Sequence, residues 1–281
     1  MTPPADRLSA RRVFDFLESG RDDRENEGFP TVETELDPSS GGGHPRSRAS
    51  LQQSRTNVHL RLVEGYTHLA RASGESCVRQ RLSALVRLFL DRVVDPKSGH
   101  LRLWFDDGWN PSSDRISFGH DIEASWVLVD AAETIQDPAL QADVEAVAIR
   151  LAEAVAKDGV DADGGILSEA DSSRVVDDDK HWWPQVEAVV GFLNVYELTN
   201  RTAWLDAASR TWGFIERTML DREHGEWFQR VSRDGTPILG DFKVDEHKCP
   251  YHNTRGCFEI MARTERLARR AETSRPPGRG R

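Results

Sequence analysis

The sequence predicts an all-α fold, a toroid of stacked helical hairpins with short β-hairpins at one end. Apolar residues recur at helical spacing through most of the 281 residues. In addition, a helix, helix, hairpin unit repeats, with hairpin glycines at Gly99, Gly165 and Gly225 that are 66 and 60 residues apart. Such units must stack to bury their apolar faces, so the repeat favours a toroid over a simple four-helix bundle.

The elements follow in chain order. A first helix covers residues 5–18, and a Gly-, Pro- and Ser-rich stretch follows it. Periodicity then predicts helices over 56–74 and 75–94, helix pairs over 121–157 and 181–220, and a last helix over 253–270. We therefore divide the chain into a helix at 1–19, an irregular loop at 20–55, a helical domain at 56–271 and a disordered tail at 272–281.

Composition excludes several classes of partner. The net charge of -10 argues against nucleic acid and against an anionic membrane. Charged residues occur throughout residues 1–16, unlike the apolar core of a signal peptide. No run approaches the roughly 18 apolar residues of a membrane helix. The three cysteines form neither a metal-ligand spacing nor a disulfide framework. We expect a cytoplasmic protein without a metal.

One short segment carries a candidate acid-base pair. Residues 117–126 (SFGHDIEASW) place His120 and Glu123 at the opening of a helix, and a spacing of three puts them on one face. A histidine beside a carboxylate can transfer protons because imidazole titrates near neutral pH. A histidine at a helix start is also often a cap or a structural residue, so the pair alone does not decide.

Two more segments occupy equivalent places in the repeat. They are residues 181–188 (HWWPQVEA) and 248–253 (KCPYHN), and each precedes or opens a helix that we assign to the inner layer. We therefore expect all three segments to converge on one end of the toroid. Two histidines facing one another there could remove and return a proton at a carbon beside a carbonyl.

The remaining candidates would contact the substrate. Trp183 and Trp104 are flat apolar surfaces of the kind that pack against sugar rings. Glu187, four residues after Trp183, is expected either to bind substrate or to support the interior.

These three segments closely resemble motifs of the N-acylglucosamine 2-epimerase family, above all of its cellobiose 2-epimerase branch. The resemblance as a whole extends over about residues 56–268. The resemblance implies an (α/α)6 barrel enzyme that uses no cofactor, opens a reducing mono- or disaccharide to its aldehyde, and inverts C2 through an enediolate. It implies that His120 and His252 are the acid-base pair, that Glu123 supports His120, and that Trp183 packs on the sugar.

The sequence also departs from the family pattern. In residues 57–64 (NVHLRLVE), Asn57 matches the family, but Arg61 replaces a histidine. Arginine stays charged and would hydrogen-bond hydroxyl groups of the substrate instead of acting as a base. His247 stands where the family has a tryptophan. About eight helices are predicted where the barrel needs twelve, so we expect an N-terminally truncated, incomplete barrel that could complete itself by self-association.

Three functions remain open at this point. The first is an epimerase or aldose-ketose isomerase acting on a cellobiose-, mannose- or N-acylglucosamine-like sugar. The second is an inactive family member, either a sugar-binding protein or a non-functional fragment. The third is a glycosidase, which would need two carboxylates flanking the scissile bond, and Glu123 and Glu187 are the candidates.

Overall fold

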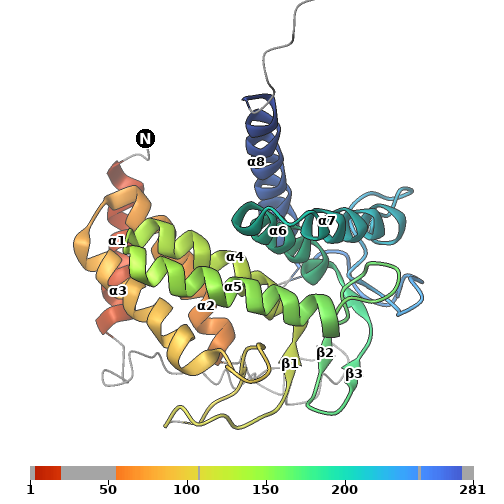
Figure 1. The fold of residues 1–281 in the computed structure, drawn as a ribbon, viewed down its shortest axis with the longest axis horizontal. Helices are drawn as coiled ribbons and strands as arrows, with labels where there is room; N and C mark the ends of the chain where they lie inside the picture. Colours follow the sequence, from red (N-terminus) through yellow and green to blue (C-terminus); the bar gives the residue numbers. More distant parts are fainter. Residues whose placement is uncertain (1–3, 20–54, 107, 246–247, 274–281) are drawn as a thin grey trace, which may run out of the picture. The chain divides into compact units, whose positions relative to one another are not determined.

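The structure, a computed structural model, is mostly helical and describes residues 4–19, 55–106, 108–245 and 248–273 (Figure 1). The α-helices in these ranges are α1 (Pro4–Ser19), α2 (Arg55–Ser73), α3 (Ser76–Leu88), α4 (Phe118–Ile135), α5 (Pro138–Asp158), α6 (Trp182–Thr199), α7 (Thr202–Phe214) and α8 (His252–Thr273). They agree with the predicted helices to within a few residues. The predicted loop at 20–55, apart from its last residue, and most of the tail at 272–281 lie outside the described residues.

Short strands and two π-helical turns join the helices. The π turns η2 (Phe89–Val93) and η3 (Ile215–Met219) extend α3 and α7. The strands are β1 (Ile116–Ser117), β2 (Glu169–Ala170), β3 (Val175–Asp177), β4 (Lys180–His181) and β5 (Arg230–Val231). They form a three-stranded sheet in the order β1-β2-β3 and an antiparallel pair β4-β5.

The predicted helix, helix, hairpin repeat is confirmed three times. Antiparallel bridges close the hairpins after η2, α5 and η3, at Val94↔Leu101, Val160↔Ile166 and Leu220↔Trp227. Each hairpin contains a glycine with positive φ, namely Gly99, Gly164 and Gly225. In the second hairpin the positive φ, +92°, is at Gly164, and Gly165 follows it in the same turn.

The described chain divides into two compact units. The first contains residues 1–116 and 127–148. There α2 packs against α3 and α1, and the ring of Phe14 lies 4.9 Å from the ring of Tyr66. The second contains residues 117–126 and 149–281, and it includes all three segments that carry the candidate residues.

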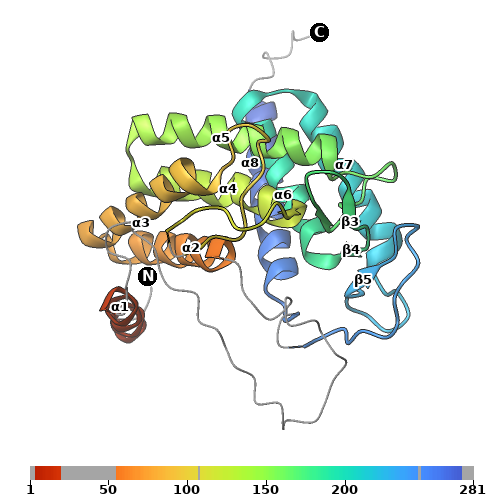
Figure 2. The same ribbon diagram turned by 90° about the horizontal axis from the view of Figure 1, so that it is seen from below.

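Helix α6 is the centre of the second unit. It packs against α7 and α8 (Figure 2), and every residue from Pro184 to Val195 is buried. A helix that is apolar on all sides belongs in a core. Two glycines allow close approach, since a Cβ at Gly191 would lie 2.7 Å from Ile122 of α4, and a Cβ at Gly256 of α8 would lie 2.3 Å from Val186.

No helix among the described residues combines the length and apolar character that crossing a membrane requires.

Candidate active site

The first turns of α4 position His120 and Glu123. His120 is half-buried, and its Nδ1 lies 2.8 Å from the hydroxyl oxygen of Ser117. Glu123 is fully buried. Gly119 lies beside His120, and a Cβ there would come within 2.3 Å of the ring of Trp183. The absence of a side chain at this position therefore lets the indole pack directly on α4.

The start of α6 positions Trp183 and Glu187, one turn apart. Strand β4 leads into the helix and is held by Lys180, whose side chain is fully buried. The ammonium nitrogen of Lys180 lies 2.8 Å from a carboxylate oxygen of Asp163 and 2.7 Å from the carbonyl oxygen of Arg233. A buried ammonium group needs such partners, so the hairpin fixes the point at which α6 begins.

The start of α8 is held in the same way. His252 is the first residue of the helix, and the buried Lys248 precedes it by four residues. The ammonium nitrogen of Lys248 lies 3.1 Å from a carboxylate oxygen of Glu226 and 2.8 Å and 2.6 Å from the carbonyl oxygens of Trp227 and Lys243. Sequence analysis did not single out either lysine. Their common place just before an aromatic or histidine motif was the available signal.

The three predicted segments converge through Trp183. The ring centroids of His120 and Trp183 are 4.9 Å apart, and those of Trp183 and His252 are 5.3 Å apart. The indole therefore lies in contact with both imidazoles, one from α4 and the other from α8. The predicted convergence of these segments is confirmed.

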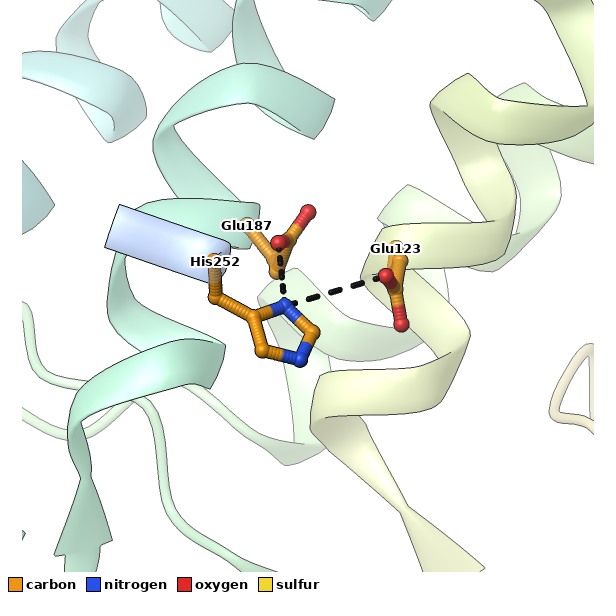
Figure 3. Close-up of side chains that lie close together, drawn as sticks. All are labelled: Glu123, Glu187 and His252. Carbon is orange, nitrogen blue, oxygen red and sulfur yellow. Dashed lines mark hydrogen bonds and ion pairs between the residues drawn. The ribbon is translucent and has the colours of Figure 1, made fainter. Parts of the chain in front are cut away.

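His252 is bonded to a carboxylate of α6. Its Nδ1 lies 2.7 Å from Glu187 Oε1 and 3.9 Å from Glu123 Oε1 (Figure 3). An ionised carboxylate can only accept, so Nδ1 carries the proton in this bond and Nε2 is the nitrogen left for chemistry, a tautomer assigned from the network. The pairing resembles the one by which a carboxylate orients a catalytic histidine and stabilises its charged form.

Arg255 joins the two carboxylates and was missed by sequence analysis. Its Nη2 lies 2.5 Å from Glu123 Oε1 and 2.7 Å from Glu187 Oε1. The second oxygen of Glu187 accepts a bond of 2.9 Å from Trp126 Nε1. The position of Arg255 three residues after His252, on the same face of α8, was the signal that could have identified it.

The same cluster has the composition of a metal site. One ligand atom each from Glu123, Glu187 and His252 lies within 4.8 Å of the others. However, the guanidinium nitrogen of Arg255 already bonds an oxygen of each carboxylate, and this supplies positive charge at the point where a cation would bind. The expected absence of a metal stays a prediction.

Comparison with known proteins identifies the family. The sequence pattern of the family described as N-acylglucosamine 2-epimerase (GlcNAc 2-epimerase) matches residues 14–254. The chain belongs to this family.

Relatives within the N-acylglucosamine 2-epimerase family agree in sequence and in fold. The cellobiose 2-epimerase of Bacteroides fragilis is 34% identical over 255 residues, which cover 90% of this chain and 65% of that protein. The cellobiose 2-epimerase of Dictyoglomus turgidum is 36% identical over 74% of this chain and 53% of that protein. The chain therefore spans between about half and two-thirds of the length of these relatives.

A solved cellobiose 2-epimerase, from Spirochaeta thermophila, superposes with a TM-score of 0.78 at 32% identity. The match covers 95% of this chain and 66% of that chain. The all-α fold class, that of the (α/α)6 barrel, is thereby confirmed.

Three further candidates lie in the first unit. Asn57 and Arg61 stand one turn apart on α2, and Arg61 Nε lies 3.5 Å from Asn57 Oδ1. Trp104 follows the first hairpin and is half-buried. Their contribution to substrate binding stays a prediction. His247, the other departure from the family pattern, lies outside the described residues.

Proposed function

We propose that this family member inverts C2 of a reducing sugar, with His120 and His252 as the acid-base pair. One observation carries the proposal: two imidazoles contact the same indole, Trp183, and the Nδ1 atom of each has a protein partner. Each ring is thereby oriented by a bond at Nδ1. The curated relatives named cellobiose 2-epimerase support a cellobiose-like substrate.

The chemistry follows from these two groups. One imidazole takes the proton from C2 of the open-chain aldose, and the electron pair of the broken C–H bond forms the C1=C2 double bond while O1 gains the negative charge. The other imidazole, in its charged form, returns a proton to the opposite face of C2, and the carbonyl re-forms. General acid-base catalysis of this kind contributes about 10²- to 10⁴-fold in rate.

The neighbouring residues support the two histidines. Glu187 holds His252 by its Nδ1 and stabilises the imidazolium form. Ser117 is the corresponding partner of the Nδ1 atom of His120. Trp183 offers an apolar face between them on which a sugar ring can pack. Glu123 was expected to support His120, but its contacts with Arg255 and its 3.9 Å distance from His252 favour a role on the His252 side.

The carboxylate geometry disfavours a glycosidase. Hydrolysis with two carboxylates needs one on each side of the scissile bond. Glu123 and Glu187 instead direct an oxygen each to the same nitrogen of Arg255.

Proton exchange tests the proposal directly. The protein is incubated in deuterated water with cellobiose, mannose or N-acetylglucosamine, and the C2 position is followed by NMR. We expect deuterium at C2 of at least one sugar, and loss of this exchange by about 10²- to 10⁴-fold in His252→Asn and His120→Asn. His224→Asn is the matched control, because His224 is exposed on the third hairpin.

Two results would overturn the proposal. The first is the absence of deuterium at C2 with all three sugars, and the second is full exchange in both histidine variants. Calorimetric titration then separates the alternatives. Sugar binding without exchange indicates an inactive sugar-binding protein, and neither binding nor exchange indicates a fragment without this function.

A further inference from the structure

Two fully buried carboxylates meet at one guanidinium nitrogen in the second unit. Glu123 of α4 and Glu187 of α6 each place Oε1 within 2.7 Å of Arg255 Nη2. Buried like charges this close cannot both stay ionised without a positive partner. Arg255 supplies that partner because a guanidinium group stays charged in proteins.

The guanidinium group is itself held in place by aromatic rings. Its Cζ lies 4.6 Å from the ring centroid of Tyr251 and 4.9 Å from that of Trp126. Its Nη1 donates a bond of 2.6 Å to the hydroxyl oxygen of Tyr251. The charge therefore has a fixed position beside the carboxylates.

The positive charge of Arg255 affects how tightly the cluster holds the proton of His252. With both carboxylates ionised and Arg255 charged, the cluster carries one net negative charge when His252 is neutral and none when His252 is protonated. Without Arg255, the same states would carry two negative charges and one. A more negative cluster holds a proton more tightly, so the neutral imidazole that can act as a base would form only at higher pH.

We propose that Arg255 is a positioning residue that sets the net charge of this cluster, so that His252 can serve both as base and as acid. The proposal rests on the proposed epimerase function. Among the described residues, the charged and titratable groups facing His252 are Glu123 from α4, Glu187 from α6, Tyr251 just before α8, and Arg255 from α8.

The pH dependence of kcat/KM for C2 exchange tests this role with Arg255→Met and Arg255→Lys. In Arg255→Met we expect the acid limb to move up by about one to three pH units, the range for removal of an opposite charge within about 4 to 6 Å. Arg255→Lys keeps the charge, so its limb should return most of the way to the wild-type position even if kcat stays low. Arg263→Met is the control, because Arg263 is another arginine of α8 that bonds residues of α6. It should leave the acid limb unchanged.

An acid limb in Arg255→Met that coincides with that of wild type overturns the proposal. So does an equal shift in Arg263→Met, because the effect would then report general loosening of α8.

A charge-rescue experiment reads the same property without activity. The ring nitrogens of His252 and the carboxyl carbons of Glu123 and Glu187 are titrated by NMR. The midpoint for uptake of a proton by the cluster should rise in Arg255→Met and fall back in Arg255→Met/Glu123→Gln, in which one negative charge has also been removed. If wild type shows no C2 exchange, the proposed function fails while this titration still decides the role of Arg255. An unshifted midpoint in Arg255→Met, or no recovery in the double variant, overturns it.

Discussion

Helices α6 and α8 are joined by two arginine-carboxylate clusters that serve different purposes. The Arg255 cluster consists of Glu123, Glu187, His252 and Arg255. The Arg263 cluster consists of Asn194, Glu197, Glu259, Arg263 and Arg266, about two turns further along α8. In it, Arg263 pairs with Glu197 and donates a 3.1 Å bond to Asn194 Oδ1, and Arg266 lies 3.2 Å from Glu197.

The two clusters differ in their balance of charge. The Arg263 cluster has two carboxylates and two arginines, because Glu259 lies 3.5 Å from Arg263 Nε. Its Asn194 also donates to the carbonyl oxygen of Ser125 in α4. The Arg255 cluster has two carboxylates, one arginine and an imidazole. The charges of the first cluster balance one another, whereas the second has one surplus negative charge that an imidazolium can neutralise. The same pair of helices thus provides both a clamp and the cluster for which we propose proton transfer.

The largest expected effect separates the two glutamates of α6. Two oxygens of Glu187 accept bonds from His252, Arg255 and Trp126, and a glutamine has only one acceptor oxygen for these three donors. Glu187→Gln should therefore reduce kcat for C2 exchange by about 10²- to 10³-fold. Glu197→Gln is the matched variant in the Arg263 cluster and should retain kcat. Equal losses of kcat in the two variants would show that the clusters do not differ in function.

The next largest effect is on stability, and it is expected in the Arg263 cluster. Arg263→Met leaves Glu197, whose side chain is 12% exposed, without its closest partner. Removing one member of a buried ion pair costs about 3 kcal/mol or more. We expect a loss near this value in urea denaturation, with kcat preserved in the folded fraction. A variant as stable as wild type would mean that the clamp contributes little.

A smaller effect is expected at the glycine between the two clusters. A Cβ at Gly256 would lie 2.3 Å from Val186 Cγ2, so Gly256→Ala forces α8 away from α6 or displaces the valine. Overpacking of this kind costs about 1 to 3 kcal/mol. Thermal denaturation should show the loss, and kcat should fall as well because His252 and Arg255 lie on the displaced helix. Gly240→Ala, at an open loop position, is the control and should change neither.

The smallest effect lies outside both clusters, at the hairpin that holds β4. Burial raises the pKa of Asp161, but hydrogen bonds from Arg233 and Lys180 lower it more, to about 2 from an ordinary value of 3.8. A carboxyl with a lowered folded-state pKa stabilises the fold above pH 4, and this contribution disappears as the pH falls from about 4 to about 2. Asp161→Asn should thus cost about 1 kcal/mol at pH 7, after allowance for solvent screening.

Denaturation at pH 7 and at pH 2.5 measures this contribution. The difference between Asp161→Asn and wild type should be fully present at pH 7 and reduced to roughly a third at pH 2.5. A difference that is independent of pH would show that the ionised carboxylate is not the source of the stabilisation.

Much of the fold could be predicted from the sequence. The helices follow from apolar spacing over 11 to 18 residues, and the hairpins follow from short Asp- and Gly-containing turns. The repeat also placed residues 117–126, 181–188 and 248–253 at equivalent positions, so their convergence in the second unit could be expected. Spacing alone does not distinguish which of the adjacent Gly164 and Gly165 takes the positive φ.

The partners within the site were decided by tertiary structure alone. The sequence by itself determined that a histidine, a carboxylate and an indole lie at or near the starts of helices, because helix starts can be located from local apolar spacing. It assigned Glu123 to His120 because the two are close in the chain. Which carboxylate bonds His252, and that Arg255 balances both carboxylates, depends on contacts between residues separated by 65, 68 and 132 positions. Such contacts are fixed by the packing of α4, α6 and α8, which local sequence does not specify.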